Sequence, residues 1–271
     1  MSRKINTSMT VGAIARDHPE LIPELERFGI DYCCGGGRTL SEEAARIGIV
    51  PDAVVEELVH HSPTPDGIRD QTDCAAMTMT ELADHIEQTH HAYARSTIDR
   101  IGKLLTKCVT AHGNDEPRLI ELRSVFRALT DDMHDHFVRE ERVLFPWLRR
   151  LERKSEITSG PPWSVRRPID CMIHDHDDVG EAFARIRSLT DDLTPPENAC
   201  PTWKECFRLL ADLERDTHRH IHKENNILFP AGIEAEIRHG HRGHHAAPHD
   251  PIARAMPPDP SHQWSAGDSN P

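Results

Sequence analysis

A residue string that occurs twice in the chain constrains its fold more than any other feature. The first copy is His134-x-His136-x-x-x-Glu140-x-x-x-Leu144-Phe145-Pro146, and the second is His218-x-His220-x-x-x-Glu224-x-x-x-Leu228-Phe229-Pro230. The matched residues are 84 positions apart, and two upstream histidines, His91 and His176, are 85 positions apart. The duplication predicts a domain built from two similar helix hairpins that carry the same chemistry.

The residues around this repeat have the spacing of long helices. Apolar side chains recur at helical intervals over about residues 79–110, 117–151, 166–190 and 200–236. The breaks between these segments carry Gly113-Asn114-Asp115, Gly160-Pro161-Pro162 and Pro195-Pro196, and a capping box, Thr78-x-x-Glu81, opens the first segment. No strand pattern competes, so we expect an all-α protein whose main domain is an up-down four-helix bundle.

Helical phase predicts which members of the repeat face the core. In the second helix the apolar stripe is interrupted by His136 and Glu140, and in the fourth helix by His220 and Glu224. These four side chains should therefore point inward. Three neighbouring histidines lie roughly 160–200° around the helix axis and are expected on the solvent face: His134, His218 and His222.

Loop positions place two more histidines at the same depth. The first hairpin turns near residue 114, so His91 should lie level with about residue 137 on the returning helix. The second hairpin turns near residue 197, which places His176 level with about residue 218. Six groups should thus meet in the core: His91, His136, Glu140, His176, His220 and Glu224.

The residue types in this cluster favour a pair of metal ions. Buried carboxylates are costly unless a cation or several hydrogen bonds compensate their charge. Imidazole and carboxylate ligands without cysteine select iron, manganese or zinc, and two carboxylates can bridge two ions. We expect two iron ions in a non-haem di-iron centre with carboxylate or oxo bridges. Ferritin-like sites use Glu-x-x-His on two helices, but here only Glu87-x-x-His90 matches.

Three further residues near the cluster stay open. Helical phase alone does not decide whether His90 or His91 faces the cluster. His112 lies about 30 Å beyond His91 along one continuous helix, so it should not reach the same centre. Asp175 either orients a ligand, lines an entry path or is an exposed acid.

Composition changes along the chain predict four parts. Residues 1–62 form a small helical domain with a cysteine pair, and residues 63–77 form a polar, proline-containing linker. Residues 78–237 form the bundle. Residues 238–271 form a His-rich tail with almost nothing apolar, which we expect to be disordered, although such a tail can also gather metal loosely.

The cysteine pair is the second candidate for chemistry. Cys33 and Cys34 precede three glycines and a capping box, Thr39-x-x-Glu42. Glycines permit unusual backbone angles, and a helix N-terminus near Thr39 would lower a thiolate pKa. We therefore expect Cys33 and Cys34 to be exposed, reactive and the candidate catalytic residues; the alternative is that both thiols only pack.

The bulk composition excludes several classes of protein. A formal charge of -13 argues against nucleic acid as a partner. No apolar run approaches the roughly 20 residues needed to cross a bilayer, so we expect no membrane partner. Seven scattered cysteines do not suggest a disulfide framework. We expect a cytoplasmic protein with reduced thiols.

Several of these motifs together resemble a known family. Asp31-Tyr32-Cys33-Cys34-Gly35-Gly36, the linker and the two His-x-x-x-Glu strings ending in Leu-Phe-Pro resemble the Repair of Iron Centres family, the YtfE/ScdA type of iron-sulfur cluster repair protein. The resemblance covers about residues 7 to 232. It implies a hemerythrin-like bundle, the same six ligands and Cys33-Cys34 as the N-terminal cysteine pair. One departure is Asp175-His176, where Glu-His is expected in the third helix.

The resemblance also implies a function. Members are cytoplasmic di-iron proteins associated with nitrosative and oxidative stress, and their partners are damaged iron-sulfur proteins. We expect an iron-donating repair protein rather than a turnover enzyme. The alternatives are a di-iron enzyme that processes nitric oxide or peroxide, and a dioxygen or redox sensor. A nitric oxide or dioxygen ligand and a homodimer stay open.

Overall fold

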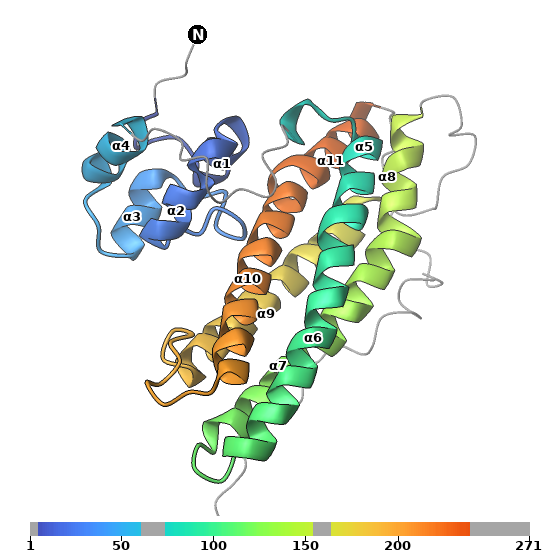
Figure 1. Ribbon diagram of the computed structural model, residues 1–271. Helices are drawn as coiled ribbons and strands as arrows, with labels where there is room; N and C mark the ends of the chain where they lie inside the picture. Colours follow the sequence, from blue (N-terminus) through green and yellow to red (C-terminus); the bar gives the residue numbers. More distant parts are fainter. Residues whose placement is uncertain (1–4, 61–73, 154–163, 239–271) are drawn as a thin grey trace, which may run out of the picture.

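The computed structural model describes residues 5–60, 74–153 and 164–238. Within these residues every regular element is a helix (Figure 1). The all-α prediction is therefore confirmed. Most of the expected linker, the Gly160-Pro161-Pro162 break and all but the first residue of the expected tail lie outside the described residues.

The four predicted long helices are present and run up and down beside one another (Figure 1). The first comprises α5 (Met79–His85), η3 (Ile86–His91) and α6 (Ala92–His112). The second comprises α7 (Arg118–Arg139), η4 (Glu140–Leu144) and α8 (Phe145–Glu152). The third is α9 (Arg166–Leu189), and the fourth comprises α10 (Pro201–Lys223), η5 (Glu224–Leu228) and α11 (Phe229–Arg238). The prediction of an up-down four-helix bundle is confirmed.

The apolar core of the bundle is divided into two clusters. The larger contains Ile101, Phe126 and Leu213, and the other contains Leu82 and Phe229. Full burial of such a side chain contributes about 1.5–3 kcal/mol to stability. The inner residues of the repeat are buried as well but belong to neither cluster, namely His136, Glu140, His220 and Glu224. Apolar packing in the bundle thus surrounds a polar layer.

Three of the four long helices widen into a π-helical turn at this polar layer. The segment η3 ends at His91, while η4 and η5 begin at Glu140 and Glu224. Pro146 and Pro230 follow the last two turns. A proline ring clashes with the carbonyl four residues earlier, and a wider turn relieves this clash. Such turns are frequent at functional sites, and the sequence analysis did not predict them.

The small domain consists of short helices around its own core. These are α1 (Val11–Asp17), η1 (Pro19–Leu21), α2 (Ile22–Phe28), α3 (Leu40–Arg46) and α4 (Pro51–His60). The core includes Ile14, Leu25 and Leu40. Helix α2 ends at Gly29, which has a φ of 71°, and the predicted capping box of Thr39 with Glu42 is present. A 3-10 turn, η2 (Cys74–Ala76), precedes the bundle.

The small domain lies against the last long helix of the bundle (Figure 1). Arg219 donates to both carboxylate oxygens of Glu26 at 3.0 and 3.1 Å. The Asn226 amide donates to the backbone carbonyls of Tyr32 and Cys33 at 3.3 and 3.2 Å. A Cβ atom on Gly36 would lie 2.2 Å from Asn226 Oδ1, so this contact needs a glycine. The cysteine loop is thereby fastened to the bundle.

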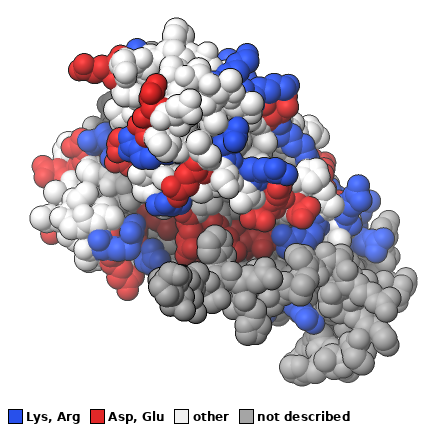
Figure 2. Space-filling view, turned by 90° about the horizontal axis from the view of Figure 1, so that it is seen from below, with Lys and Arg blue, Asp and Glu red and all other residues white. Residues whose placement is uncertain are grey.

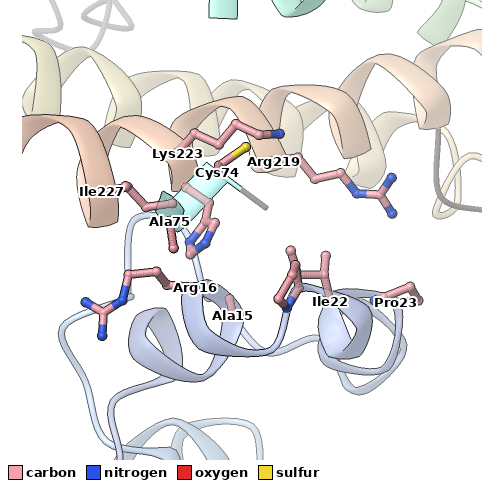
Figure 3. A pocket seen from close by; sticks show the side chains of 11 residues that line it. Ala15, Arg16, Ile22, Pro23, Cys74, Ala75, Arg219, Lys223 and Ile227 are labelled. Carbon is pink, nitrogen blue, oxygen red and sulfur yellow. The ribbon is translucent and has the colours of Figure 1, made fainter. Parts of the chain in front are cut away.

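A small pocket lies within this interface (Figure 3). In the figure Ala15, Ile22 and Pro23 of the small domain face Arg219 and Lys223 of the bundle. None of the six predicted metal ligands lines the pocket. The polar layer of the bundle therefore does not line this pocket.

Docking of the small domain overturns one prediction about the outer histidines. His222 was expected on the solvent face, but it is buried, with its ring 5.4 Å from that of Tyr32. His218 is half-buried beside Phe183, so the same prediction was wrong in part. His134 is exposed as predicted. Helical phase gave the correct direction for all three, but the domain that covers this face could not be inferred from phase.

The surface carries mixed charges. Figure 2 shows Lys and Arg side chains interspersed with Asp and Glu, without a continuous basic area among the described residues of that face. One example of this mixing is Arg118, which pairs with both Glu116 and Asp191. Among the described residues, no helix has both the length and the apolar character needed to cross a membrane.

Candidate metal centre

The structure brings all six predicted ligands together in the polar layer of the bundle. Their donor atoms form two groups, and within each group all atoms lie within 4.8 Å of one another. The first group is His91, Glu140, His220 and Glu224, and the second is His136, Glu140, His176 and Glu224. Each group contains two histidines of its own, and both groups share the two glutamates.

The shared glutamates each place one oxygen in each group. Glu140 Oε2 lies 3.4 Å from His91 Nε2, and its Oε1 lies 3.2 Å from His136 Nε2. Glu224 Oε1 lies 3.0 Å from His220 Nε2, and its Oε2 lies 3.2 Å from His176 Nε2. Each carboxylate therefore faces both groups of donors.

The histidines meet through the atoms that would bind metal. The Nε2 atoms of His91 and His220 are 3.2 Å apart, and those of His136 and His176 are 3.1 Å apart. Neutral imidazole presents a lone pair at one ring nitrogen when the other carries the proton. Two nitrogen atoms and two carboxylate oxygens therefore converge on each of two points.

The two glutamates lack ordinary partners. Both are fully buried, and none of their four oxygens has an aligned hydrogen-bond donor among the described residues. Burial and mutual repulsion oppose their charged forms, but the surrounding imidazoles hold the pKa of Glu140 and that of Glu224 below the usual range. Ionised carboxylates without hydrogen bonds at this depth fit a site for metal cations.

The pKa values of the histidines also show where the polar layer favours positive charge. Burial disfavours the charged form of His136, but Glu140 and Asp175 outweigh it and raise the pKa of His136 to about 10. In contrast, burial and the neighbouring His91 lower the pKa of His220 well below its usual range. Against the opposing effect of burial, Glu140 also raises the pKa of His91. The layer therefore favours a proton on His91 and on His136, and a metal ion would displace these protons because a histidine ligand is neutral.

Three polar residues orient the ligand rings by accepting a hydrogen bond from Nδ1. His91 donates to Glu141 at 2.7 Å, His136 donates to Asp175 at 3.0 Å, and His176 donates to Asn225 at 2.9 Å. Each bond fixes the proton on Nδ1 and leaves Nε2 free to bind metal. The orienting role left open for Asp175 is therefore observed.

Two of these acceptors were missed by the sequence analysis. Glu141 and Asn225 are themselves 84 positions apart, like Glu140 and Glu224. Each follows a repeated glutamate and orients the histidine of the preceding helix. The duplication therefore includes residues that orient the ligands as well as the ligands themselves. The residue that follows each repeated glutamate was the sequence signal that could have identified these two acceptors.

The remaining histidines lie outside the centre. His90 is buried and stacks on His220, but its Nδ1 donates to Asp216 at 3.0 Å and its Nε2 accepts from Lys223 at 2.9 Å. His112 contacts Cys200 Sγ at 3.4 Å, in agreement with its exclusion. The choice between His90 and His91 is therefore resolved by the hydrogen bonds that occupy both His90 nitrogens.

The cysteine pair differs from the prediction in two respects, because Cys33 is buried rather than exposed and the pKa of its thiol is raised rather than lowered. Cys33 is buried, and its hydrogen bond with Cys34, its burial and the nearby Asp31 carboxylate raise the pKa of its thiol well above the usual range. The expected lowering by the helix at Thr39 is therefore wrong for Cys33, because that helix is already capped by its own side chains. Cys34 is half-buried and points at the bundle, 3.7 Å from the carbonyl of His176.

Comparison with known proteins agrees with this architecture. Residues 82–232 match the hemerythrin HHE cation binding domain, and residues 7–62 match the ScdA N-terminal domain, a domain of unknown function. The iron-sulfur cluster repair protein ScdA of Staphylococcus haemolyticus is 28% identical over 225 residues, which cover 83% of this chain and 98% of the relative. The iron-sulfur cluster repair protein YtfE of Dickeya chrysanthemi is 30% identical over 227 residues, which cover 84% of this chain and 97% of the relative. The chain belongs to the hemerythrin HHE family of cation-binding proteins, in the two-domain form that it shares with the iron-sulfur cluster repair proteins YtfE and ScdA.

Proposed function

We propose that this protein holds two iron ions in its bundle and donates iron to iron-sulfur clusters damaged by nitrosative or oxidative stress. The observation that carries the proposal is the pair of buried, bridging glutamates that lack other partners. The names of the relatives, which are cluster repair proteins, support the choice of target. Damaged iron-sulfur proteins would be the partners.

The donor set suits an ion that must leave again. His91, His136, His176 and His220 bind as neutral imidazoles, and Glu140 and Glu224 supply the only two negative charges among the six ligands. Thiolates, which hold iron in its clusters, are softer ligands than these. Iron bound here can therefore move to a sulfur-rich target. Bound iron would also supply redox chemistry and affinity for small gases.

Residues beside the ligands determine how tightly the bundle holds iron. Glu141, Asp175 and Asn225 hold the ligand rings in place, and loosening any of them would weaken iron binding. The cysteine pair is proposed to act in the transfer, since Cys34 contacts the backbone of the ligand-bearing residue His176. No disulfide joins the seven cysteines, all of which lie within the described residues, and this fits work in the reducing cytoplasm.

A second candidate is an enzyme that processes nitric oxide or peroxide. The observation in its favour is the number of protein donors, because each group offers only four and leaves positions open on an iron ion. On this candidate the centre itself would turn over and iron would stay in the protein.

One experiment separates the two candidates. The iron-loaded protein is mixed with an enzyme whose cluster has been damaged by nitric oxide, while an electrode follows dissolved nitric oxide and an assay follows the target enzyme. The proposal predicts recovery of the target with matching loss of iron from the protein. Consumption of nitric oxide without recovery or iron loss would instead support the gas-processing enzyme.

A further inference from the structure

A second cluster of metal-binding side chains lies in the loop between α2 and α3. Asp31, Cys33 and Cys34 place a carboxylate oxygen and two sulfur atoms within 4.8 Å of one another. The cluster shares no residue with the bundle centre. Two thiols and a carboxylate provide donors that the bundle lacks, namely soft sulfur ligands.

The loop is built to hold these three donors together. Asp31 Oδ1 accepts from the backbone N–H of Cys33 at 3.2 Å and from its thiol at 3.3 Å, while Oδ2 accepts from the N–H of Gly35 at 2.8 Å. A Cβ atom on Gly35 would lie 2.8 Å from this carboxylate, so only glycine lets the chain come so close. Glu43 in turn accepts from the N–H of Asp31 at 3.1 Å. The cluster is thus fixed by its own domain.

We propose that Asp31, Cys33 and Cys34 form a separate binding site for one divalent, sulfur-preferring cation of the iron(II) or zinc class. Two thiolates would balance the charge of the cation, and the Asp31 carboxylate would add a third, negatively charged donor. Without the cation the two sulfurs carry protons. Three protein donors also leave a fourth position free, as in sites that exchange ligands rather than in closed structural sites. A sulfur atom of a target protein could occupy that position.

The cluster of Asp31, Cys33 and Cys34 lies next to the bundle centre, and this position indicates what the site does. Cys34 Sγ lies 3.7 Å from the carbonyl of His176, and Asn226, which holds the loop, directly follows Asn225, the residue that orients the His176 ring. On α9 the loop contacts the ligand residue His176 itself, and on η5 one residue, Asn225, separates Asn226 from the ligand Glu224. This role, as a relay for iron leaving the bundle, rests on the proposed function, whereas cation binding itself does not.

The relay step balances without a redox partner. Iron(II) leaves the carboxylates and imidazoles of the bundle as an ion and keeps its oxidation state. On reaching the loop it binds two sulfurs, and Cys33 and Cys34 release two protons to water. No electron is transferred: the bonds from iron to the bundle ligands and the two S–H bonds break, while two iron–sulfur bonds form and water takes up the two protons.

The test uses the full-length, iron-loaded protein and cobalt(II) as the probe. Titration without oxygen should add one cobalt per chain and a near-ultraviolet cobalt-thiolate absorption, while the bundle keeps its iron. Cys34→Ser should weaken this absorption, and Cys33→Ser together with Cys34→Ser should abolish it. Asp31→Asn should lower cobalt affinity on the order of tenfold or more. Cys171→Ser, which changes a half-buried cysteine outside the cluster, should leave the titration unchanged.

The outcomes separate this inference from the proposed function. A wild-type protein that repairs its target but shows no cobalt-thiolate absorption would overturn the loop site and leave iron donation standing. A protein that shows the absorption but does not repair its target would support the loop site and overturn iron donation. Because Asp31→Asn also loosens the loop, Cys34→Ser serves as the milder variant, and an absorption that survives in both would overturn the assignment of these donors.

Discussion

The small domain and the bundle both bury glutamates completely, yet they compensate them in different ways. Glu43 in the small domain accepts hydrogen bonds from Arg38 at 3.0 Å, from Arg46 at 2.5 Å and from the backbone. Glu140 and Glu224 in the bundle lie beside imidazole nitrogens, and no residue in the described part of the chain offers them an aligned donor. A carboxylate with guanidinium partners is satisfied by the fold itself, whereas one without them needs a cation from outside.

This comparison shows that a buried glutamate can either stabilise the fold through arginine partners or provide oxygen ligands for a cation. Burial of Glu43 ties α3 to the cysteine loop and makes the small domain self-sufficient. Burial of Glu140 and Glu224 leaves the bundle dependent on metal. The following predictions change one side of the contrast at a time.

The largest effect is expected from Glu140→Ala or Glu224→Ala. Each variant removes an oxygen from both metal groups, so iron should be lost completely. Iron at 100 times its dissociation constant stabilises a protein by about 2.7 kcal/mol, so the melting temperature in iron should fall by about 5–10 °C. Metal analysis and thermal unfolding measure both effects. His134→Ala, on the exposed side of the same helix, is the control, and equal iron loss from it would refute the assignment of inner and outer faces.

The next effect concerns Glu43→Gln. The neutral amide cannot satisfy both arginines, so the small domain should lose about 2–3 kcal/mol of stability. The iron content should not change, because Glu43 lies in the other domain. Hydrogen exchange of peptides from residues 5–60 reports the small domain separately from the bundle. Loss of iron in this variant would show that the two regions are not independent.

Acid should have a related effect on the small domain. Burial opposes the charge on Glu43, but Arg46, the N–H of Asp31 and Arg38 outweigh it and lower the pKa of Glu43. A lowered folded-state pKa gives stability that is present above about pH 4.5, the ordinary pKa, and is lost as the pH falls through the folded value. Exchange in residues 5–60 should therefore rise in acid. Glu43→Gln should remove much of this dependence, and an unchanged profile would contradict the role of Glu43.

A smaller effect is expected from Asp175→Asn. The amide oxygen can still accept from His136 Nδ1, so the ring keeps its orientation but loses the negative charge behind it. Iron affinity should fall about tenfold without loss of fold. Competition with an iron chelator measures the change. Asp178→Asn alters an exposed acid on the same helix and is the matched control; an equal effect from it would mean that general surface charge, not orientation, sets the affinity.

Much of the bundle could be predicted from the sequence because its chemistry is repeated. Helical phase and loop positions were sufficient to bring His91 and His176 to the level of the two His-x-x-x-Glu pairs. They did not predict the π-helical turns at Glu140 and Glu224, since these depend on how a later proline is accommodated. Phase also assumes a uniform helix.

The misses elsewhere have two physical causes. His222 is buried because the small domain, which is distant in the sequence, covers it. The pKa of the Cys33 thiol is raised by its neighbours Cys34 and Asp31 and by burial. Helical phase contains no information on the first contact, and the sequence alone does not give the loop conformation that turns Asp31 and Cys34 toward the Cys33 thiol.

The most direct test of the central claim is the metal content of protein purified without oxygen from iron-replete cells. Because two bridging carboxylates and four imidazoles form two groups, the account predicts about two iron ions per chain, falling to none in both Glu140→Ala and Glu224→Ala. One zinc ion per chain, or two iron ions that survive either substitution, would contradict it.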